Sequence, residues 1–177
     1  MADLVRWLAP AAILAAHSCY AAQYLNVEQA QASVFPEARD FVPLPVKLSG
    51  EQARMIERLS GVRVRSNEQR VWEARAQGQL LGWFLVDEVY GKHELITYAV
   101  GIGLAGEVRH IEVMDYRESY GYEIRNPAWR RQFAGKHRGD PLQLDQDIKN
   151  ITGATLSCRH IAEGVKRLLA LHEVVLR

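Results

Sequence analysis

The chain has 177 residues, of which 48% are apolar and 24% are charged, close to the average of a globular domain. This composition excludes disordered, collagen-like and fibrous classes, and the length predicts one domain with a short appendage. Because the formal net charge is only +1, the chain as a whole lacks the basic surface that nucleic-acid binding needs, and no nucleic-acid partner is expected.

The N-terminal segment has the pattern of a secretory signal peptide. Arg6 precedes the apolar stretch 7–16, small residues follow, and the stretch is shorter than the ~20 residues of a membrane-spanning helix. We expect a signal peptide over 1–21, cleavage after Ala21, and a periplasmic or otherwise extracytoplasmic location that includes association with a membrane. The alternatives are a cytosolic amphipathic helix, which the absence of a polar face disfavours, and lipidation of Cys19. Loss of Cys19 would leave Cys158 without a disulfide partner, and we interpret Cys158 as a small buried residue rather than a reactive thiol.

Residues 22–79 are expected to form an N-terminal extension with a helix and short strands. The polar, alanine-rich stretch 22–40 predicts a tether, and the prolines of 41–46 favour an extended backbone. Ser49 and Gln52 form a capping box, which predicts a helix that ends near Gly61.

The rest of the chain predicts an α+β fold. A short helix is expected over 127–133, with Pro127 in its first turn. A last helix is expected over 156–171, where apolar residues recur at helical spacing and Lys166 and Arg167 lie on the other face. The simplest architecture is an antiparallel sheet with flanking helices, at its ends or on one face. The predicted strands are 62–65, 70–75, 80–90, 95–102 and 108–116.

A dinucleotide-binding pattern is present but lies in the wrong context. Gly101, Gly103 and Gly106 match G-x-G-x-x-G, whose mechanism requires a helix to begin within the motif. Here the following residues alternate between apolar and polar, so these glycines predict a hairpin between two strands. The histidines lack the spacing of metal ligands, and no metal site is expected.

The most informative segment is 152–157, where small and hydroxyl residues immediately precede the last helix. Free backbone N–H groups at a helix start, together with hydroxyl groups, can bind a phosphate. The alternative is ordinary capping of the helix by Thr155 or Ser157, and spacing alone does not decide between these two roles.

The string Thr152-Gly153-Ala154-Thr155-Leu156-Ser157 resembles the S/T-G-A-T-x-S/T signature of the FMN-binding domain family. That family includes the covalently flavinylated subunits of sodium-pumping NADH:quinone oxidoreductase and of the related Rnf complexes. Segments 91–100, 117–121, 129–136 and 164–169 also fit, in the family's order, so the resemblance covers roughly residues 80–171. It implies an FMN-binding domain over 80–177.

The resemblance also implies a set of site residues. In the family, the last threonine of the signature is esterified to the FMN phosphate by a magnesium-dependent flavin transferase that uses FAD as donor. The transferase motif usually has an aspartate six residues before this threonine, where this chain has Lys149; Asp147 is a candidate substitute. The implied cofactor-binding residues are Thr155 as covalent acceptor, its neighbours Thr152, Gly153, Ala154, Leu156 and Ser157, and Glu118, Tyr120 and Gly121 near the flavin ring.

The function that follows is electron transfer by an exported flavoprotein. The resemblance implies FMN held through a threonine phosphoester, with electrons passing between a membrane redox protein and another carrier. The flavin supplies the redox chemistry, so we expect a carrier or subunit rather than a stand-alone enzyme, and no catalytic residues. The alternative is an exported, non-redox binding domain that has the fold but binds FMN non-covalently or not at all.

Overall fold

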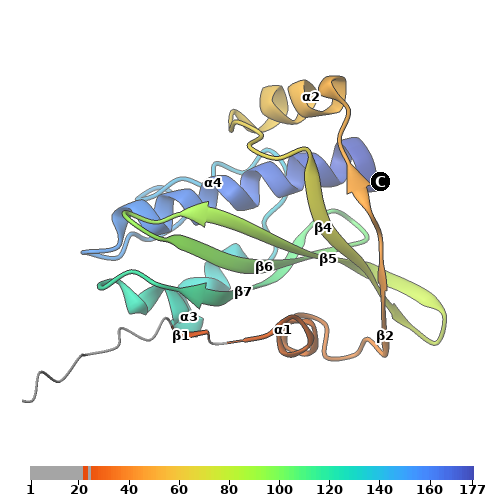
Figure 1. Ribbon diagram of the computed structural model, residues 1–177, viewed down its shortest axis with the longest axis horizontal. Helices are drawn as coiled ribbons and strands as arrows, with labels where there is room; N and C mark the ends of the chain where they lie inside the picture. Colours follow the sequence, from red (N-terminus) through yellow and green to blue (C-terminus); the bar gives the residue numbers. More distant parts are fainter. Residues whose placement is uncertain (1–21, 24) are drawn as a thin grey trace, which may run out of the picture.

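A twisted antiparallel sheet forms the centre of the protein (Figure 1), as seen in a computed structural model that describes residues 22–23 and 25–177. The predicted signal peptide, with Cys19 and the cleavage site at Ala21, lies outside the described residues. The strands follow the order β1-β7-β6-β5-β4-β2, and β3 pairs with the far end of β4. Their bounds are β1 Ala22–Gln23, β2 Asp40–Pro43, β3 Val46–Lys47, β4 Glu68–Ala76, β5 Gln79–Tyr90, β6 Leu95–Gly103 and β7 Val108–Tyr116.

Strands β4 to β7 form a meander of neighbouring antiparallel pairs, as their apolar runs predicted. The expected strand at 62–65 is wrong, because this segment has no partner strand. Its alternation of residues is nevertheless real. Val62 and Val64 are half-buried while Arg63 and Arg65 are exposed, and the Val64 N–H donates to Glu57 Oε1 over 2.9 Å. The pattern therefore reports a linker with one buried side.

Helices cover both faces of the sheet rather than one (Figure 1). The bounds are α1 Val27–Val34, α2 Gly50–Ser60, η1 Tyr122–Arg125, α3 Pro127–Arg130, η2 Arg131–Phe133, α4 Thr155–Leu171 and η3 His172–Leu176. On one face, Trp83 and Leu85 of β5 share a core with α4, while on the other Phe84 and Val86 pack with α1. Because alternate side chains of a strand point to opposite faces, two covered faces require the continuous apolar run that β5 shows.

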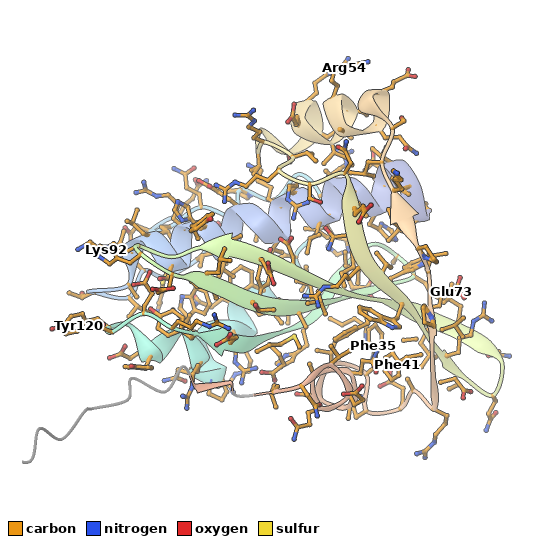
Figure 2. The ribbon with its side chains drawn as sticks, in the orientation of Figure 1. Phe35, Phe41, Arg54, Glu73, Lys92 and Tyr120 are labelled. Carbon is orange, nitrogen blue, oxygen red and sulfur yellow. The ribbon has the colours of Figure 1, made fainter. Side chains whose placement is uncertain are left out.

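The expected tether over 22–40 is wrong, because this stretch contains α1. Asn26 and Gln29 form a capping box at its start, with the Gln29 N–H donating to Asn26 Oδ1 over 2.8 Å. Phe35, directly after the helix, is fully buried and packs on Phe41, with ring centroids 6.4 Å apart (Figure 2). The alanines that suggested a tether allow the helix to lie close to the sheet.

The glycine-rich segment forms a hairpin, as predicted, but its glycines have different roles. Gly106 lies in the turn with a φ of 84°, a conformation that glycine adopts readily. Gly101 lies inside β6, where a Cβ atom would collide with Val34 of α1 and lie 3.0 Å from Phe35. The absence of a side chain at Gly101 therefore makes room for α1.

Helix α2 confirms the capping-box prediction, with Ser49 as N-cap and Gly61 as a left-handed C-cap. Helix α4 corrects the prediction for Arg167, which is buried rather than on an outer face. Its guanidinium lies 2.6 Å from Asp87 Oδ2, and the same carboxylate accepts a hydrogen bond of 2.5 Å from the Tyr98 hydroxyl. This ion pair fixes α4 on β5.

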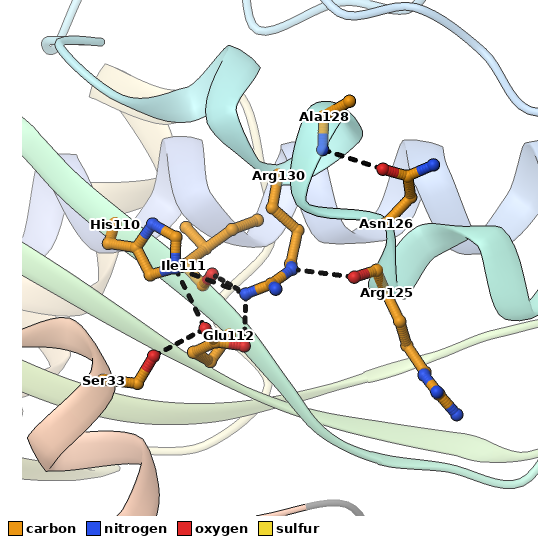
Figure 3. A network of polar contacts seen from close by, with 8 residues as sticks. All are labelled: Ser33, His110, Ile111, Glu112, Arg125, Asn126, Ala128 and Arg130. Atoms are coloured by element: carbon orange, nitrogen blue, oxygen red, sulfur yellow. Dashed lines mark hydrogen bonds and ion pairs between the residues drawn. The ribbon is translucent and has the colours of Figure 1, made fainter.

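A buried carboxylate on β7 joins three elements of the fold (Figure 3). Glu112 accepts a hydrogen bond of 2.7 Å from Ser33 of α1, lies 3.0 Å from His110 Nε2, and pairs with Arg130 of α3. Burial raises the pKa of the Glu112 carboxyl, but hydrogen bonds with His110, Arg130 and Ser33 outweigh burial and lower it to about 2. The carboxylate therefore stays charged and ties α1 and α3 to the sheet.

None of the helices in the described part of the chain has both the length and the apolar character to cross a membrane.

Candidate functional site

The N-terminus of α4 lies at the end of the molecule opposite the C-terminus (Figure 1). Thr155 is the first helical residue and Ala154 is the N-cap, without any side chain capping the helix. The capping role considered for Thr155 and Ser157 is therefore wrong. The first three N–H groups, of Thr155, Leu156 and Ser157, have no acceptor inside the helix and are suited to an external anion.

The Thr155 hydroxyl is held from the preceding loop. Asn150 Nδ2 donates to Thr155 Oγ1 over 3.1 Å, and the Ala154 N–H donates to the Ile151 carbonyl over 2.9 Å. Between them, Thr152 and Gly153 form an exposed turn, in which Gly153 has a φ of 86° and open space around it. The signature segment thus presents Thr155, Thr152 and the Gly153 backbone to solvent.

The structure brings the second predicted segment against the first. Gly121, with a φ of 88°, lies so close to the signature that a Cβ atom would be 2.5 Å from Ala154 Cβ and 2.7 Å from the Tyr116 hydroxyl. That hydroxyl donates to the Tyr120 carbonyl over 2.5 Å and lies 3.4 Å from the buried Ser157 Oγ. Tyr116 therefore joins the loop of Tyr120 and Gly121 to the start of α4.

Glu118 points away from this junction, into the turn between β5 and β6. Its Oε1 accepts hydrogen bonds from the N–H groups of His93, over 2.6 Å, and Glu94, over 3.1 Å. Burial raises the pKa of the Glu118 carboxyl, but donation from the His93, Glu94 and Lys92 N–H groups outweighs burial and lowers the pKa. In this structure Glu118 fixes the position of the loop.

Large apolar side chains are exposed around the same end of the molecule. Tyr120, whose side chain extends from this end together with Lys92 (Figure 2), is 79% exposed. Tyr122 packs edge-on against Tyr116, with ring centroids 5.7 Å apart. These residues offer flat, partly apolar surface beside the signature. The exposed set here is Tyr90, Leu95, Tyr120, Tyr122 and Leu156.

A groove of about 730 Å³, which we call the Thr155 groove, runs along α4 from Thr155. Its other walls are the linker after α2 and the loop 141–145. In the described part of the chain, none of its four basic side chains, Arg63, Arg65, Arg159 and Lys166, is in an ion pair, and Asp145 and Glu163 are its acidic members. The groove therefore favours an anionic ligand. A smaller cavity of about 390 Å³, on the other side of the linker, does not include Thr155.

The two charged residues before the signature differ in accessibility. The side chain of Lys149 is exposed, while the Asp147 carboxylate is occupied within its own loop. Asp147 accepts hydrogen bonds from Lys136 Nζ over 2.9 Å and from the N–H groups of Leu142 and Gln143 over 3.1 and 2.8 Å. Burial raises the pKa of the Asp147 carboxyl, but these donors outweigh burial and lower the pKa. Asp147 therefore serves the fold of the loop.

The structure also adds residues that the sequence did not single out. Asn150, Tyr116 and Arg159 contact or border the signature, and only Arg159, four residues after Thr155, had a detectable signal in its helical spacing. Cys158 confirms its interpretation as a buried residue, since burial raises the pKa of its thiol to about 11 and keeps the thiol protonated at neutral pH.

Comparison with known proteins agrees with this geometry. Residues 91–170 match the model of the FMN-binding domain family. NqrC of Shewanella oneidensis has a similar structure, with a TM-score of 0.54 and 14% identity over 82% of this chain and 88% of that one. The corresponding subunit of the Na(+)-translocating NADH-quinone reductase of Parabacteroides distasonis gives 0.52 and 14%, over 85% of each chain. No curated protein matches the chain. Together with the family match, these likenesses show that the chain carries an FMN-binding domain, on a fold similar to that of NqrC.

Proposed function

We propose that this protein is an exported electron-transfer flavoprotein that holds FMN through a phosphoester bond to Thr155. The observation that carries the proposal is the position of the Thr155 hydroxyl, at the uncapped start of a 17-residue helix and in a groove with four basic side chains outside ion pairs. A phosphate there would meet the free N–H groups and the positive end of the α4 dipole.

The residues around Thr155 fit a flavin nucleotide. Arg159 lies one turn along α4, on the same side of the helix as Thr155, where its guanidinium can pair with a phosphate. Tyr120 and Leu156 supply exposed apolar surface for a flat ring, and Gly121 keeps the loop close to α4. FMN supplies the redox chemistry when bound, while the chain supplies attachment and orientation.

The proposed partners follow from this chemistry. Attachment needs a magnesium-dependent flavin transferase with FAD as donor, and electron flow needs a membrane redox protein and a second carrier. The exposure of Tyr120 and Tyr122 supports this role, because a carrier must let partner proteins approach its cofactor.

Non-covalent binding of FMN in the same place is the second candidate. The observation that favours it is Lys149, which stands where the transferase motif has an aspartate, while the nearby Asp147 carboxylate is occupied by Lys136 and backbone N–H groups. Both candidates use the same groove, so Thr155 distinguishes them.

The decisive experiment is co-expression with a flavin transferase, followed by denaturing gel electrophoresis, in-gel flavin fluorescence and intact-mass measurement. The wild type should carry one FMN after denaturation. Thr155→Ala should lose the fluorescence and that mass, and Thr155→Ser should keep some label because it keeps a hydroxyl. Thr155→Ala should fold normally, since Thr155 does not cap α4. The same mass should show cleavage after Ala21, and a chain that starts at residue 1 or 2 would contradict the signal peptide.

Each other outcome has a defined meaning. Fluorescence that survives denaturation in Thr155→Ala would place the attachment elsewhere. A wild type that is yellow when native but colourless after denaturation would support non-covalent binding. A wild type that never acquires flavin would overturn both candidates.

A further inference from the structure

The Asn150 side chain contacts the oxygen at which attachment is proposed. Its Nδ2 donates to Thr155 Oγ1 over 3.1 Å, while its Oδ1 is buried and has no hydrogen-bond partner among the described residues. The Thr155 hydroxyl is thus the single side-chain partner of this amide in the described part of the chain. A buried amide with only this partner is held in place for the hydroxyl.

The backbone on both sides of Asn150 fixes the amide in this position. The Lys149 N–H donates to Gln132 Oε1 over 2.8 Å, and the Lys149 carbonyl accepts a hydrogen bond of 2.8 Å from the indole of Trp129. Trp129 is buried on α3, which Arg130 ties to Glu112 (Figure 3). The Asn150 amide is therefore supported by the core and needs little reorganisation to act on Thr155.

We propose that Asn150 assists the flavin-transfer step by holding Thr155 Oγ1 and stabilising the negative charge that develops there. This inference rests on the proposed covalent attachment. In that step, Oγ1 forms a bond to the phosphorus of the FMN half of FAD, the bond from this phosphorus to the AMP oxygen breaks, and AMP leaves. The hydroxyl proton passes to a base of the transferase or to water. A preorganised N–H donor aimed at the attacking oxygen lowers the barrier of such a step.

The placement of Asn150 predicts which kinetic constant it controls. Because its amide faces Thr155 and is partly buried, it acts on bond formation rather than on the surface that the transferase contacts. Its loss should lower kcat of flavin transfer and leave KM for this protein unchanged. A residue that merely supported the fold would instead lower the thermal stability.

The experiment measures initial rates of FMN incorporation into the full chain, with purified transferase, FAD and Mg²⁺, over a range of acceptor concentrations. Asn150→Asp keeps the size but removes the N–H donor, and Asn150→Ala removes it without adding charge. Both should lower kcat by about tenfold or more, with KM and the unfolding temperature unchanged. Gln146→Ala, which alters an exposed side chain in the same loop, is the matched control and should leave kcat unchanged.

Three results would overturn the proposal. The first is a wild-type kcat in both Asn150 variants. The second is a loss confined to Asn150→Asp, which would identify charge repulsion as the cause. The third is a fall in kcat that matches a fall in folded protein. In all three the wild type is labelled, so the proposed function stands; an unlabelled wild type would instead refute the covalent attachment itself.

Discussion

Glu112 shows how one side chain can connect distant parts of the chain. Its carboxylate is shared by Ser33, His110 and Arg130, which come from α1, β7 and α3. From α3 and η2, Trp129 and Gln132 reach the backbone at Lys149, next to the loop that holds the Thr155 hydroxyl. A polar group in the core thereby helps to set the position of a surface site.

The lowered pKa of Glu112 predicts a pH dependence of stability. A folded pKa of about 2, below the unfolded value, means that the charged carboxylate stabilises the fold above about pH 4.5 and that this contribution is lost as pH falls towards 2. Between pH 7 and pH 3 the wild type should lose about 2 kcal/mol more stability than Glu112→Gln, measured by urea unfolding at each pH. Glu28→Gln, at an exposed position, is the control and should follow the wild type. Equal losses in wild type and Glu112→Gln would contradict the assigned role.

Among the elements, α1 is the one that completes the sheet. It covers the face formed by Ala74, Phe84, Val86, Ala99 and Met114, and it can approach closely because residue 101 has no side chain. Helix α1 and strand β6 are therefore matched in shape.

Replacing Gly101 by alanine tests this match. The added Cβ would collide with Val34, so Gly101→Ala should lower the free energy of unfolding by about 1–3 kcal/mol, measured by urea titration. The double variant Gly101→Ala, Val34→Ala should lose less than the sum of the two single changes, because the second change removes the colliding atoms. Gly50→Ala, whose Cβ would meet only Arg54 Nη1 at 3.6 Å, should be close to neutral. If Gly101→Ala were as neutral as Gly50→Ala, α1 would not pack as described.

The elements whose signals are local in sequence were predictable. The capping box at Ser49, the alternating strands of the meander and the periodicity of α4 all lie within short windows. Helix α1 was missed although Asn26 and Gln29 repeat the same capping pattern, and the apolar run Trp83-Phe84-Leu85-Val86 already indicated a sheet covered on both faces. The residues that predict α1 are therefore present in the sequence.

The site was predictable only in part, for a different reason. The signature segment and the loop at Gly121 were identified by resemblance, but their contact through Tyr116 joins residues 41 positions apart. The Asn150 hydrogen bond depends on the turn at Gly153, and the burial of Arg167 depends on Asp87 in a distant strand. Such pairings are set by tertiary structure and leave no periodic trace in the sequence.

For the molecule as a whole, the sheet extends beyond the part that matches the family. The match covers 91–170, yet β4 pairs with β5 along most of its length, and α1 covers the face that β5, β6 and β7 share. The boundary predicted at residue 80 falls between these two paired strands, inside one continuous sheet.

A chain trimmed to residues 80–177 should therefore fail to fold alone. Without α1 and β4, the apolar face that includes Phe84 and Met114 would be exposed to water. We expect strong binding of a hydrophobic dye, loss of near-ultraviolet circular dichroism and no cooperative thermal transition. A chain that begins at residue 22 keeps these elements and should unfold cooperatively. Cooperative unfolding of the shorter chain would show that residues 80–177 are self-sufficient.

Helix α4 also gives the molecule a direction. Its last residues, Leu168 to Leu171, are buried, whereas its first residue lies at the exposed end, and 17 helical residues span about 25 Å. A solid support that captured the protein by its C-terminus would thus hold every copy in the same orientation. Thr155 and Tyr120 would face the solution on the side away from the support, which suits the protein to measurements on oriented layers.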